Sequence, residues 1–202
     1  MLFRSIARLL PCADDESGFR PLFAPNASDG WTQCGPGRFT LTNGVATSHG
    51  GMGLWWHTNS QFTNFVLRGE WRFMNRESDS GVFVRFPNPG QDPWNAVKLG
   101  LELELGDDPT GQDPAWRTGA WYPFQPPTHV PTKLVGEWNS YELVAFGQTY
   151  LARINGELVA VWTDPRRRCA AGHIGLQNYA DGKGAQHRRL RLKDLLHGVV
   201  SK

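Results

Sequence analysis

The sequence is poor in cysteine and in long hydrophobic runs. Its 202 residues include three cysteines, Cys12, Cys34 and Cys169, whose odd number and wide spacing fit reduced thiols better than a disulfide framework. No Cys-x-x-Cys pair is present to indicate structural zinc. No apolar run approaches the length that crosses a bilayer, and Arg4 and Arg8 interrupt the first residues, where a signal peptide would be continuously apolar. We therefore expect a cytoplasmic protein with no membrane partner.

An excess of charge is also missing. Lysine and arginine number 21 against 19 acidic residues, and a formal net charge of +2 gives no long-range attraction to nucleic acid or anionic lipid. The densest basic clusters, at residues 166–168 and 188–191, are short, and they lie beside turn signals or alternate along a strand, as solvated surface does. Nucleic acid is therefore not an expected partner.

The residues that are abundant are those of strands and tight turns. Nine Trp and eleven Phe accompany 23 Gly and 14 Pro, which favours strands joined by short turns over a helical bundle. From Phe39 onward apolar and polar residues alternate with a period of two, as in residues 65–73, FVLRGEWRF. Asn155-Gly156 is a dipeptide that a type I′ hairpin prefers, because both of its positions need a positive φ.

These patterns predict an all-β protein. After residue 19 no amphipathic helix longer than about three turns fits the 3.6-residue period. Roughly ten to thirteen short strands suit a two-sheet antiparallel β-sandwich of the jelly-roll kind. We expect an N-terminal extension at residues 1–18, a single β-sandwich domain at residues 19–197 and a C-terminal tail at residues 198–202.

The stretch VKLGLELELGDD, residues 97–108, holds the main chemical candidates. Glu102 and Glu104 share one face of a strand about 6 to 7 Å apart, while leucines fill the other face. Such a face either meets open solvent or lines a cleft, and unpaired like charges slightly favour a site that contains Arg, Lys or a metal. Paired carboxylates serve proton transfer beside a cation, or glycoside cleavage as acid and nucleophile or base. Asp107 would join the pair if the strand bulges there.

Two segments rich in Pro and Gly, residues 87–93 and 107–131, have the composition of long loops at one rim of the sandwich. A loop as long as the second is usually functional or disordered, and its aromatic residues argue against disorder. Trp116 and Trp121 are the preferred candidates for stacking on a sugar face. The histidines follow no metal-ligand spacing, so the sequence assigns no metal ligand among them.

Taken in order along the chain, the segments SDSGVFVRF, GLELELGD, RTGAWY and GHIGLQNY resemble the 3-keto-disaccharide hydrolase domains, which are also described as 3-keto-glucoside lyase and hydratase domains. The likeness covers about residues 19–195. It implies the concanavalin A-like lectin/glucanase sandwich and a distant structural relation to glycoside hydrolase family 16.

The resemblance also implies positions for the site. Glu102 matches the Glu of a Glu-x-Gln strand motif, and Asp107 lies near the Asp that follows it. Arg85 matches the end of Ser-Gly-Val-Phe-x-Arg, Tyr122 matches the Tyr of Thr-Gly-x-x-Tyr, and Gln177 matches the Gln of Gly-x-Ile-Gly-Leu-Gln. These side chains are therefore expected to meet in one cleft.

Three positions depart from the family pattern. Glu104 stands where Gln is usual, Tyr179 stands where a His is common, and Arg189 stands where the closing strand usually carries Asn. The first change adds negative charge to the cleft. The second removes a base or metal ligand, for which His129 in the long loop is the best substitute.

The activity that the resemblance implies is cleavage of a small carbohydrate or glycoside whose carbon 3 carries a ketone. The ketone acidifies the proton on carbon 2, so a base removes it and the glycosidic oxygen leaves. We expect Glu104 to be the base, and Glu102 to be an electrostatic anchor or the ligand of a divalent cation, with no other cofactor expected. Arg85 would either stabilise the enolate or form a structural ion pair with a glutamate.

Two alternatives stay open. In the first, Glu102 and Asp107 cleave an unoxidised glycoside by the two-carboxylate route. In the second, the chain is a non-catalytic, lectin-like module that binds carbohydrate, because this sandwich serves both uses and fold alone does not determine function.

Overall fold

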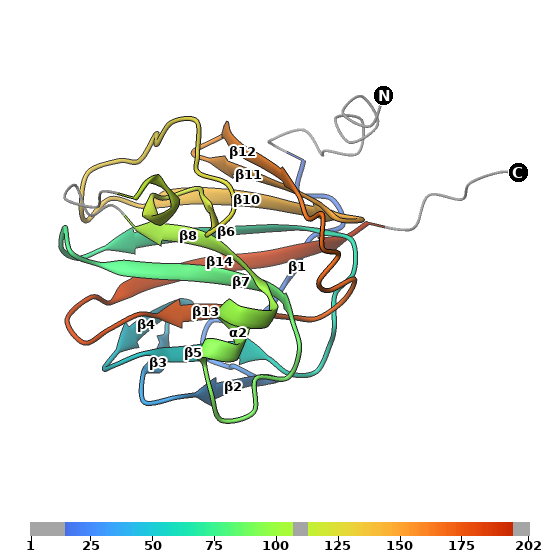
Figure 1. The fold of residues 1–202 in the computed structure, drawn as a ribbon. Coiled ribbons are helices and arrows are strands. Elements are labelled where there is room, and N and C mark those ends of the chain that lie inside the picture. The colour runs from blue at the N-terminus through green and yellow to red at the C-terminus, as the bar shows by residue number, and fades with distance from the viewer. Residues whose placement is uncertain (1–14, 107–112, 196–202) are drawn as a thin grey trace, which may run out of the picture.

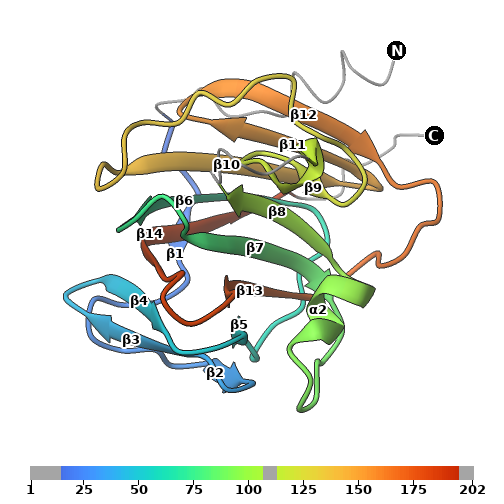
Figure 2. The same ribbon diagram turned by 60° about the vertical axis from the view of Figure 1, so that its left-hand side comes forward.

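Two antiparallel sheets pack face to face, as Figures 1 and 2 show from two directions. The computed structural model describes residues 15–106 and 113–195. The predictions for Asp107, for most of the extension at residues 1–18 and for the tail at residues 198–202 lie outside the described residues. The fold class predicted from the sequence, an all-β antiparallel sandwich, is confirmed.

The larger sheet has eight strands in the order β12-β11-β10-β6-β14-β4-β3, with β1 paired to β14. Its strands are β1 Arg20–Pro21, β3 Arg38–Thr42, β4 Val45–His49, β6 Phe65–Phe73, β10 Asn139–Phe146, β11 Thr149–Ile154, β12 Glu157–Thr163 and β14 Ala185–Asp194. Strands β10, β11 and β12 form the meander that the sequence predicts. In the hairpin between the last two, Asn155 and Gly156 have φ of 49° and 86°, as a type I′ turn requires.

The smaller sheet has six strands in the order β2-β5-β13-β7-β8-β9. Its strands are β2 Trp31–Cys34, β5 Gly53–His57, β7 Asp79–Phe86, β8 Leu101–Gly106, β9 Trp121–Tyr122 and β13 His173–Asn178. Two short helical elements flank it, α2 at Trp94–Leu99 and the 3-10 helix η1 at Pro114–Trp116. None of the helices in the part of the chain that the structure describes has the length and hydrophobicity of a membrane span.

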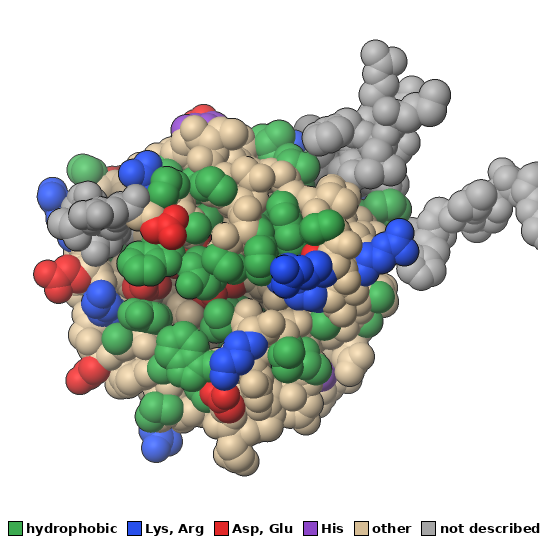
Figure 3. Space-filling model, viewed as in Figure 1, with side chains coloured by type: hydrophobic (Ala, Val, Ile, Leu, Met, Phe, Trp, Pro, Cys, Tyr) green, Lys and Arg blue, Asp and Glu red, His purple; other side chains and the backbone are tan. Residues whose placement is uncertain are grey.

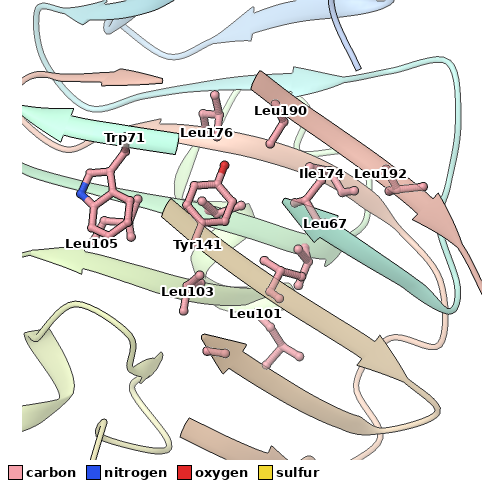
Figure 4. Packing of buried hydrophobic residues seen from close by; sticks show 14 of the residues in the cluster. Leu67, Trp71, Leu101, Leu103, Leu105, Tyr141, Ile174, Leu176, Leu190 and Leu192 are labelled. Atoms are coloured by element: carbon pink, nitrogen blue, oxygen red, sulfur yellow. The ribbon is translucent and has the colours of Figure 1, made fainter. Parts of the chain in front are cut away.

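The core lies between the two sheets, where alternate residues of each strand meet. Leu101, Leu103 and Leu105 of β8 are at most 3% exposed and point toward the larger sheet, where Leu67 and Tyr141 belong to the same cluster (Figure 4). Since successive side chains of a strand point to opposite faces, the glutamates between these leucines face outward, away from the core. The alternation in the sequence thus predicts correctly which face of β8 carries the acids.

The segment before β8 differs from the extended chain that the alternation predicts. Residues 94–99 form α2, and Leu99 at its end is 46% exposed instead of lying in the core. Asp92 accepts a hydrogen bond from the Trp94 N–H at 3.0 Å, and Pro93 pre-sets the φ of the first turn. Ala96 is buried in a small apolar cluster with Phe83, so α2 covers part of the outer face of the smaller sheet.

A β-bulge reverses the direction of Arg85. In the pairing of β7 with β13, Val84 and Phe86 have partners on β13 and Arg85 is skipped, with a φ of 53°. The side chain therefore turns to the core side, where its guanidinium donates to the Thr63 carbonyl at 2.7 Å and to the Tyr150 hydroxyl at 2.7 Å. The prediction that Arg85 points outward, toward the glutamates, is wrong, because the bulge breaks the period of two.

Candidate active site

A pocket of about 200 Å³ lies on the outer face of the smaller sheet, where β7 begins and β8 and β13 end. Its floor includes Asp79 of β7 and Glu102 and Glu104 of β8. Figure 3 shows this face, with hydrophobic side chains gathered around recessed acidic ones. The two glutamates thus line a hollow of the surface, which is one of the two possibilities that the sequence leaves open.

Three carboxyl groups converge on the floor because of the register of the two strands. Asp79 is paired with Gly106 and Gly81 is paired with Glu104, so Asp79 stands beside the end of β8. The carboxyl group of Glu104 lies within hydrogen-bonding reach of the Asp79 carboxyl group. Glu102 and Glu104 are 3% and 7% exposed. Carboxyl groups this close and this buried repel each other when ionised, which favours protonation of the floor.

The electrostatics of the floor favour the neutral form of both glutamates. Burial is the main reason why the pKa of Glu102 lies well above its usual value, and the charge of Asp79 raises it further. Burial also raises the pKa of Glu104 well above its usual value, helped by the charges of Glu102 and Asp79 and by the hydrogen bond with Asp79. A hydrogen bond from the backbone of Leu105 opposes these effects in part. Both groups therefore keep protons at pH values where exposed glutamates have lost them.

Glu102 lies in a space that a missing side chain leaves open. A Cβ on Gly81 would overlap the Glu102 carboxyl group, so the glycine of β7 makes room for the acid across the strand pair. Within the described residues, Glu102 Oε1 has no hydrogen-bond partner, and neither has Gln177 Oε1, which lines the same pocket. Buried polar atoms are normally paired, so these two oxygens are ready to meet a ligand.

Several residues that the sequence analysis singles out do meet here. Trp116, Tyr122 and Gln177 line the pocket together with Glu102 and Glu104. Tyr122 of β9 is the cross-strand partner of Glu102, which places the two residues side by side. The backbone of the long loop is anchored along β8, since Gly119 N donates to the Glu104 carbonyl at 2.9 Å.

Other predicted residues lie elsewhere. Trp121 is fully buried in the core, 5.5 Å from the Tyr150 ring, because its neighbour Tyr122 takes the face toward the pocket. His129 is outside the pocket, with Nε2 2.9 Å from a Glu157 carboxylate oxygen. Arg189 lies on the larger sheet and pairs with Glu70 at 2.8 Å. The predictions that Trp121 stacks on a sugar in the cleft and that His129 replaces the family His there are therefore wrong. Asp107 lies outside the described residues.

The pocket also contains residues that the sequence analysis does not propose as site residues. Asp79 is the most important, and a signal for it exists, since pairing SDSGVFVRF against LELEL in antiparallel register places Asp79 and Gly81 beside the glutamates. Arg117 and Lys183 bring positive charge to the pocket, in place of the displaced Arg85. Trp94 and Tyr179 add aromatic walls, and no local pattern links these two residues to β8.

The donor set gives no support for a bound metal. Over residues 15–106 and 113–195, no group of three or more His, Cys, Asp or Glu side chains is placed to hold a metal ion. The divalent cation therefore stays a prediction, and no chemical step below depends on it.

Replacing Glu104 with glutamine is expected to stabilise the protein at alkaline pH. Folding raises the pKa of Glu104 above its unfolded value, so its stabilising contribution is complete below the unfolded pKa and is lost as the pH rises through the folded pKa. Glutamine is neutral at every pH, so the free energy of unfolding of Glu104→Gln should exceed that of wild type at pH 8 by on the order of 1–3 kcal/mol. Urea unfolding at pH 4, 6 and 8 measures this difference.

The gain should shrink toward pH 4, where the wild-type carboxyl is protonated in both states. Glu137→Gln is the matched control, because Glu137 is exposed, has no ion pair among the described residues, and accepts a hydrogen bond from the Leu134 N–H that glutamine can keep. Its replacement should leave the pH dependence unchanged. A Glu104→Gln difference that is the same at all three pH values would show that the proton of Glu104 is not the cause.

The fold and the pocket together define a class of protein, namely a lectin-type two-sheet sandwich with an acidic pocket on the outer face of one sheet. The family described as the 3-keto-alpha-glucoside-1,2-lyase-like domain matches residues 18–193, and the chain belongs to this family. No curated protein matches the sequence.

Solved structures resemble the chain at the level of fold. A candidate glycosyl hydrolase from Parabacteroides distasonis ATCC 8503 is 18% identical with a TM-score of 0.74, covering 92% of this chain and 98% of that one. A Bacillus subtilis protein with a galectin-like fold is 13% identical with a TM-score of 0.64, covering 87% and 94%. The carbohydrate-binding module CBM66 from Bacillus subtilis is 12% identical with a TM-score of 0.56, covering 82% and 96%.

Proposed function

We propose that this protein cleaves the glycosidic bond of a sugar that has been oxidised to a ketone at carbon 3. The observation that carries the proposal is the buried Glu102 carboxyl in a pocket whose floor holds two more acids, with one oxygen that has no hydrogen-bond partner among residues 15–106 and 113–195. Membership of the 3-keto-alpha-glucoside-1,2-lyase-like family supports the same chemistry. A buried carboxyl with a raised pKa is suited to proton transfer near neutral pH.

The proposed reaction is a β-elimination. The base takes the proton from carbon 2, the electrons of that C–H bond form a double bond between carbons 1 and 2, and the bond from carbon 1 to the glycosidic oxygen breaks. The leaving oxygen takes up a proton, so the products are an alcohol and a conjugated enone. Addition of water to the enone then gives the free 3-keto sugar, and the net result is hydrolysis.

Glu102 is the base that this geometry favours. Among the described residues its Oε1 has no hydrogen-bond partner, so the ionised form of Glu102 can accept the proton from carbon 2, and its raised pKa makes that form a stronger base. Glu104, by contrast, lies against the Asp79 carboxyl group. These roles are the reverse of those expected from the sequence, in which Glu104 is the base and Glu102 is the electrostatic anchor. Glu104 becomes the proton donor to the leaving oxygen, since its neutral form is favoured by burial and by the Asp79 charge.

Negative charge that develops on the ketone oxygen needs a partner in the pocket. Arg85 does not serve, because its guanidinium is bound on the core side of the sheet. Arg117 and Lys183 line the pocket and supply the positive charge in this proposal. The Tyr122 hydroxyl and the Gln177 side chain contribute hydrogen bonds that orient the sugar.

A product-resolved assay tests this function directly. Incubation with methyl 3-keto-glucoside should release methanol and give the enone or the free 3-keto sugar, while methyl glucoside should remain intact. Because no step above uses a metal, the rate should be the same with and without a chelator. Cleavage of the unoxidised glycoside would instead support the two-carboxylate hydrolase, and a loss of activity with chelator would require a cation.

A non-catalytic carbohydrate-binding module is the second candidate. The likeness of fold to the binding module CBM66 supports it, as does the exposed Trp116 at the pocket. It predicts that calorimetry detects binding of an unoxidised glycoside, that Glu102→Gln binds it equally well, and that no 3-keto sugar is turned over.

A further inference from the structure

Three aromatic side chains are partly exposed at the acidic pocket. Trp94, Trp116 and Tyr179 line it and are 41%, 57% and 39% exposed. An aromatic ring left in water forgoes the free energy of burying its face, and exposed aromatic clusters at a pocket are typical of ligand contacts. Figure 3 shows that hydrophobic side chains gather on this face of the molecule around the acids.

The three rings come from separate elements and approach the pocket from two sides. On the β13 side, Trp94 at the start of α2 meets Tyr179 edge to face, with ring centroids 6.3 Å apart. Lys183 Nζ lies 5.8 Å from the centroid of the Tyr179 ring and helps to hold it in place. On the β8 side, Trp116 belongs to η1, and its carbonyl packs against Gly106 at the end of the strand. Trp94 and Tyr179 therefore form one wall that their mutual contact holds in place, and Trp116 forms the other.

The pocket is large enough for the reacting sugar but not for the leaving group as well. A volume of about 200 Å³ is below the range of about 300–1,000 Å³ in which sites enclose drug-sized ligands, so there is room for one sugar ring above the acids. The group attached at carbon 1 must then extend to the surface, past Trp94 and Tyr179 or past Trp116.

We infer that Trp94, Trp116 and Tyr179 determine substrate specificity, by binding a flat aromatic ring in the leaving group of the glycoside. The preferred substrates are then 3-keto-glycosides of aryl-bearing alcohols. The inference rests on the proposed function for the reacting sugar, and it adds the chemical class of the leaving group.

The test compares two substrates that differ in the shape of the ring and share the same kind of leaving oxygen. These are 2-phenylethyl and 2-cyclohexylethyl 3-keto-glucoside, which are both primary alkyl glycosides. Wild type should cleave the phenyl substrate with a kcat/KM about two- to tenfold higher, the advantage expected of an aromatic pair beyond the area it buries. Trp94→Ala and Trp116→Ala should each bring the ratio closer to one, and Trp116→Phe should restore it.

Leu134→Ala is the matched control, because Leu134 is 77% exposed and lies outside the pocket, so the ratio should keep its wild-type value. An equal kcat/KM for the two substrates in wild type would overturn the inference, and so would a 3-keto-disaccharide cleaved faster than both. If no 3-keto substrate reacts, the proposed function fails, and calorimetry with the unoxidised 2-phenylethyl and 2-cyclohexylethyl glucosides decides the inference instead. Tighter binding of the phenyl compound that is lost in Trp116→Ala supports it, and equal binding refutes it.

Discussion

Replacing Glu102 with glutamine is expected to lower kcat for elimination from a 3-keto-glucoside by at least about two orders of magnitude, the range of a general base. Glutamine has nearly the same shape and keeps an oxygen at the pocket, but it cannot accept the proton from carbon 2. KM should change little, because the variant removes proton transfer and leaves the walls of the pocket in place. Steady-state kinetics and exchange of a deuterium label at carbon 2 measure the two effects.

Glu157→Gln is the control for this experiment, since it makes the same chemical change at an exposed acid outside the pocket. It should retain the wild-type rate. Glu102→Gln should also stay folded, because the buried acid with a raised pKa is exchanged for a neutral side chain. If this variant keeps a rate within about threefold of wild type, the base is another group, and Glu104 is the first to examine.

Replacing Arg85 with methionine is expected to cost about 3 kcal/mol or more of unfolding free energy and to leave the chemistry of the folded protein intact. The Arg85 guanidinium is fully buried and donates to the carbonyl oxygens of Thr63 and Gly147 as well as to the Tyr150 hydroxyl. Charge-assisted hydrogen bonds of this kind are stronger than neutral ones, and methionine would leave the buried carbonyl groups without their donor. Thermal unfolding should shift down by about 2–4 °C for each kcal/mol lost.

Arg189→Met is the matched control for Arg85. Both arginines have a φ of 53° and lie where the strand register shifts, so the backbone strain of the substitution is similar. The Arg189 side chain is 64% exposed and pairs with Glu70 at the surface, so its loss should cost within about 1 kcal/mol. The opposite outcome, a stable Arg85→Met that has lost activity, would restore the substrate-binding role that the sequence predicts for Arg85.

The sandwich itself can be predicted from the sequence, because a strand with one buried face shows alternating apolar and polar residues. The spacing of Leu101, Leu103 and Leu105 predicts the buried face of β8, and the Asn155-Gly156 dipeptide predicts a hairpin. No sequence pattern predicts the bulge at Arg85, because the identity of the residue does not indicate that its φ is positive. The boundary between α2 and β8 is equally hidden, because apolar residues such as Leu99 fit both structures.

The part of the site that belongs to one strand could be predicted from the sequence, and the part that comes from different elements could not. Glu102 and Glu104 are two residues apart, so any strand places them on the same face. Asp79 comes from the neighbouring strand, and its contact with Glu104 depends on the register of β7 against β8. Trp94 and Tyr179 are more than 80 residues apart in sequence and meet through the packing of α2 over the sheet and the position of β13.

The amino-acid sequence by itself determined the two sheets, the outward face of the acids and the family, because these follow from local alternation and from the order of short motifs along the chain. Tertiary structure alone decided that the acids lie in a hollow instead of open water, that Asp79 lies beside Glu104 and that Arg85 faces the core. Burial and cross-strand register are properties of the folded chain. They set the pKa values and the hydrogen bonds from which the proposed chemistry follows.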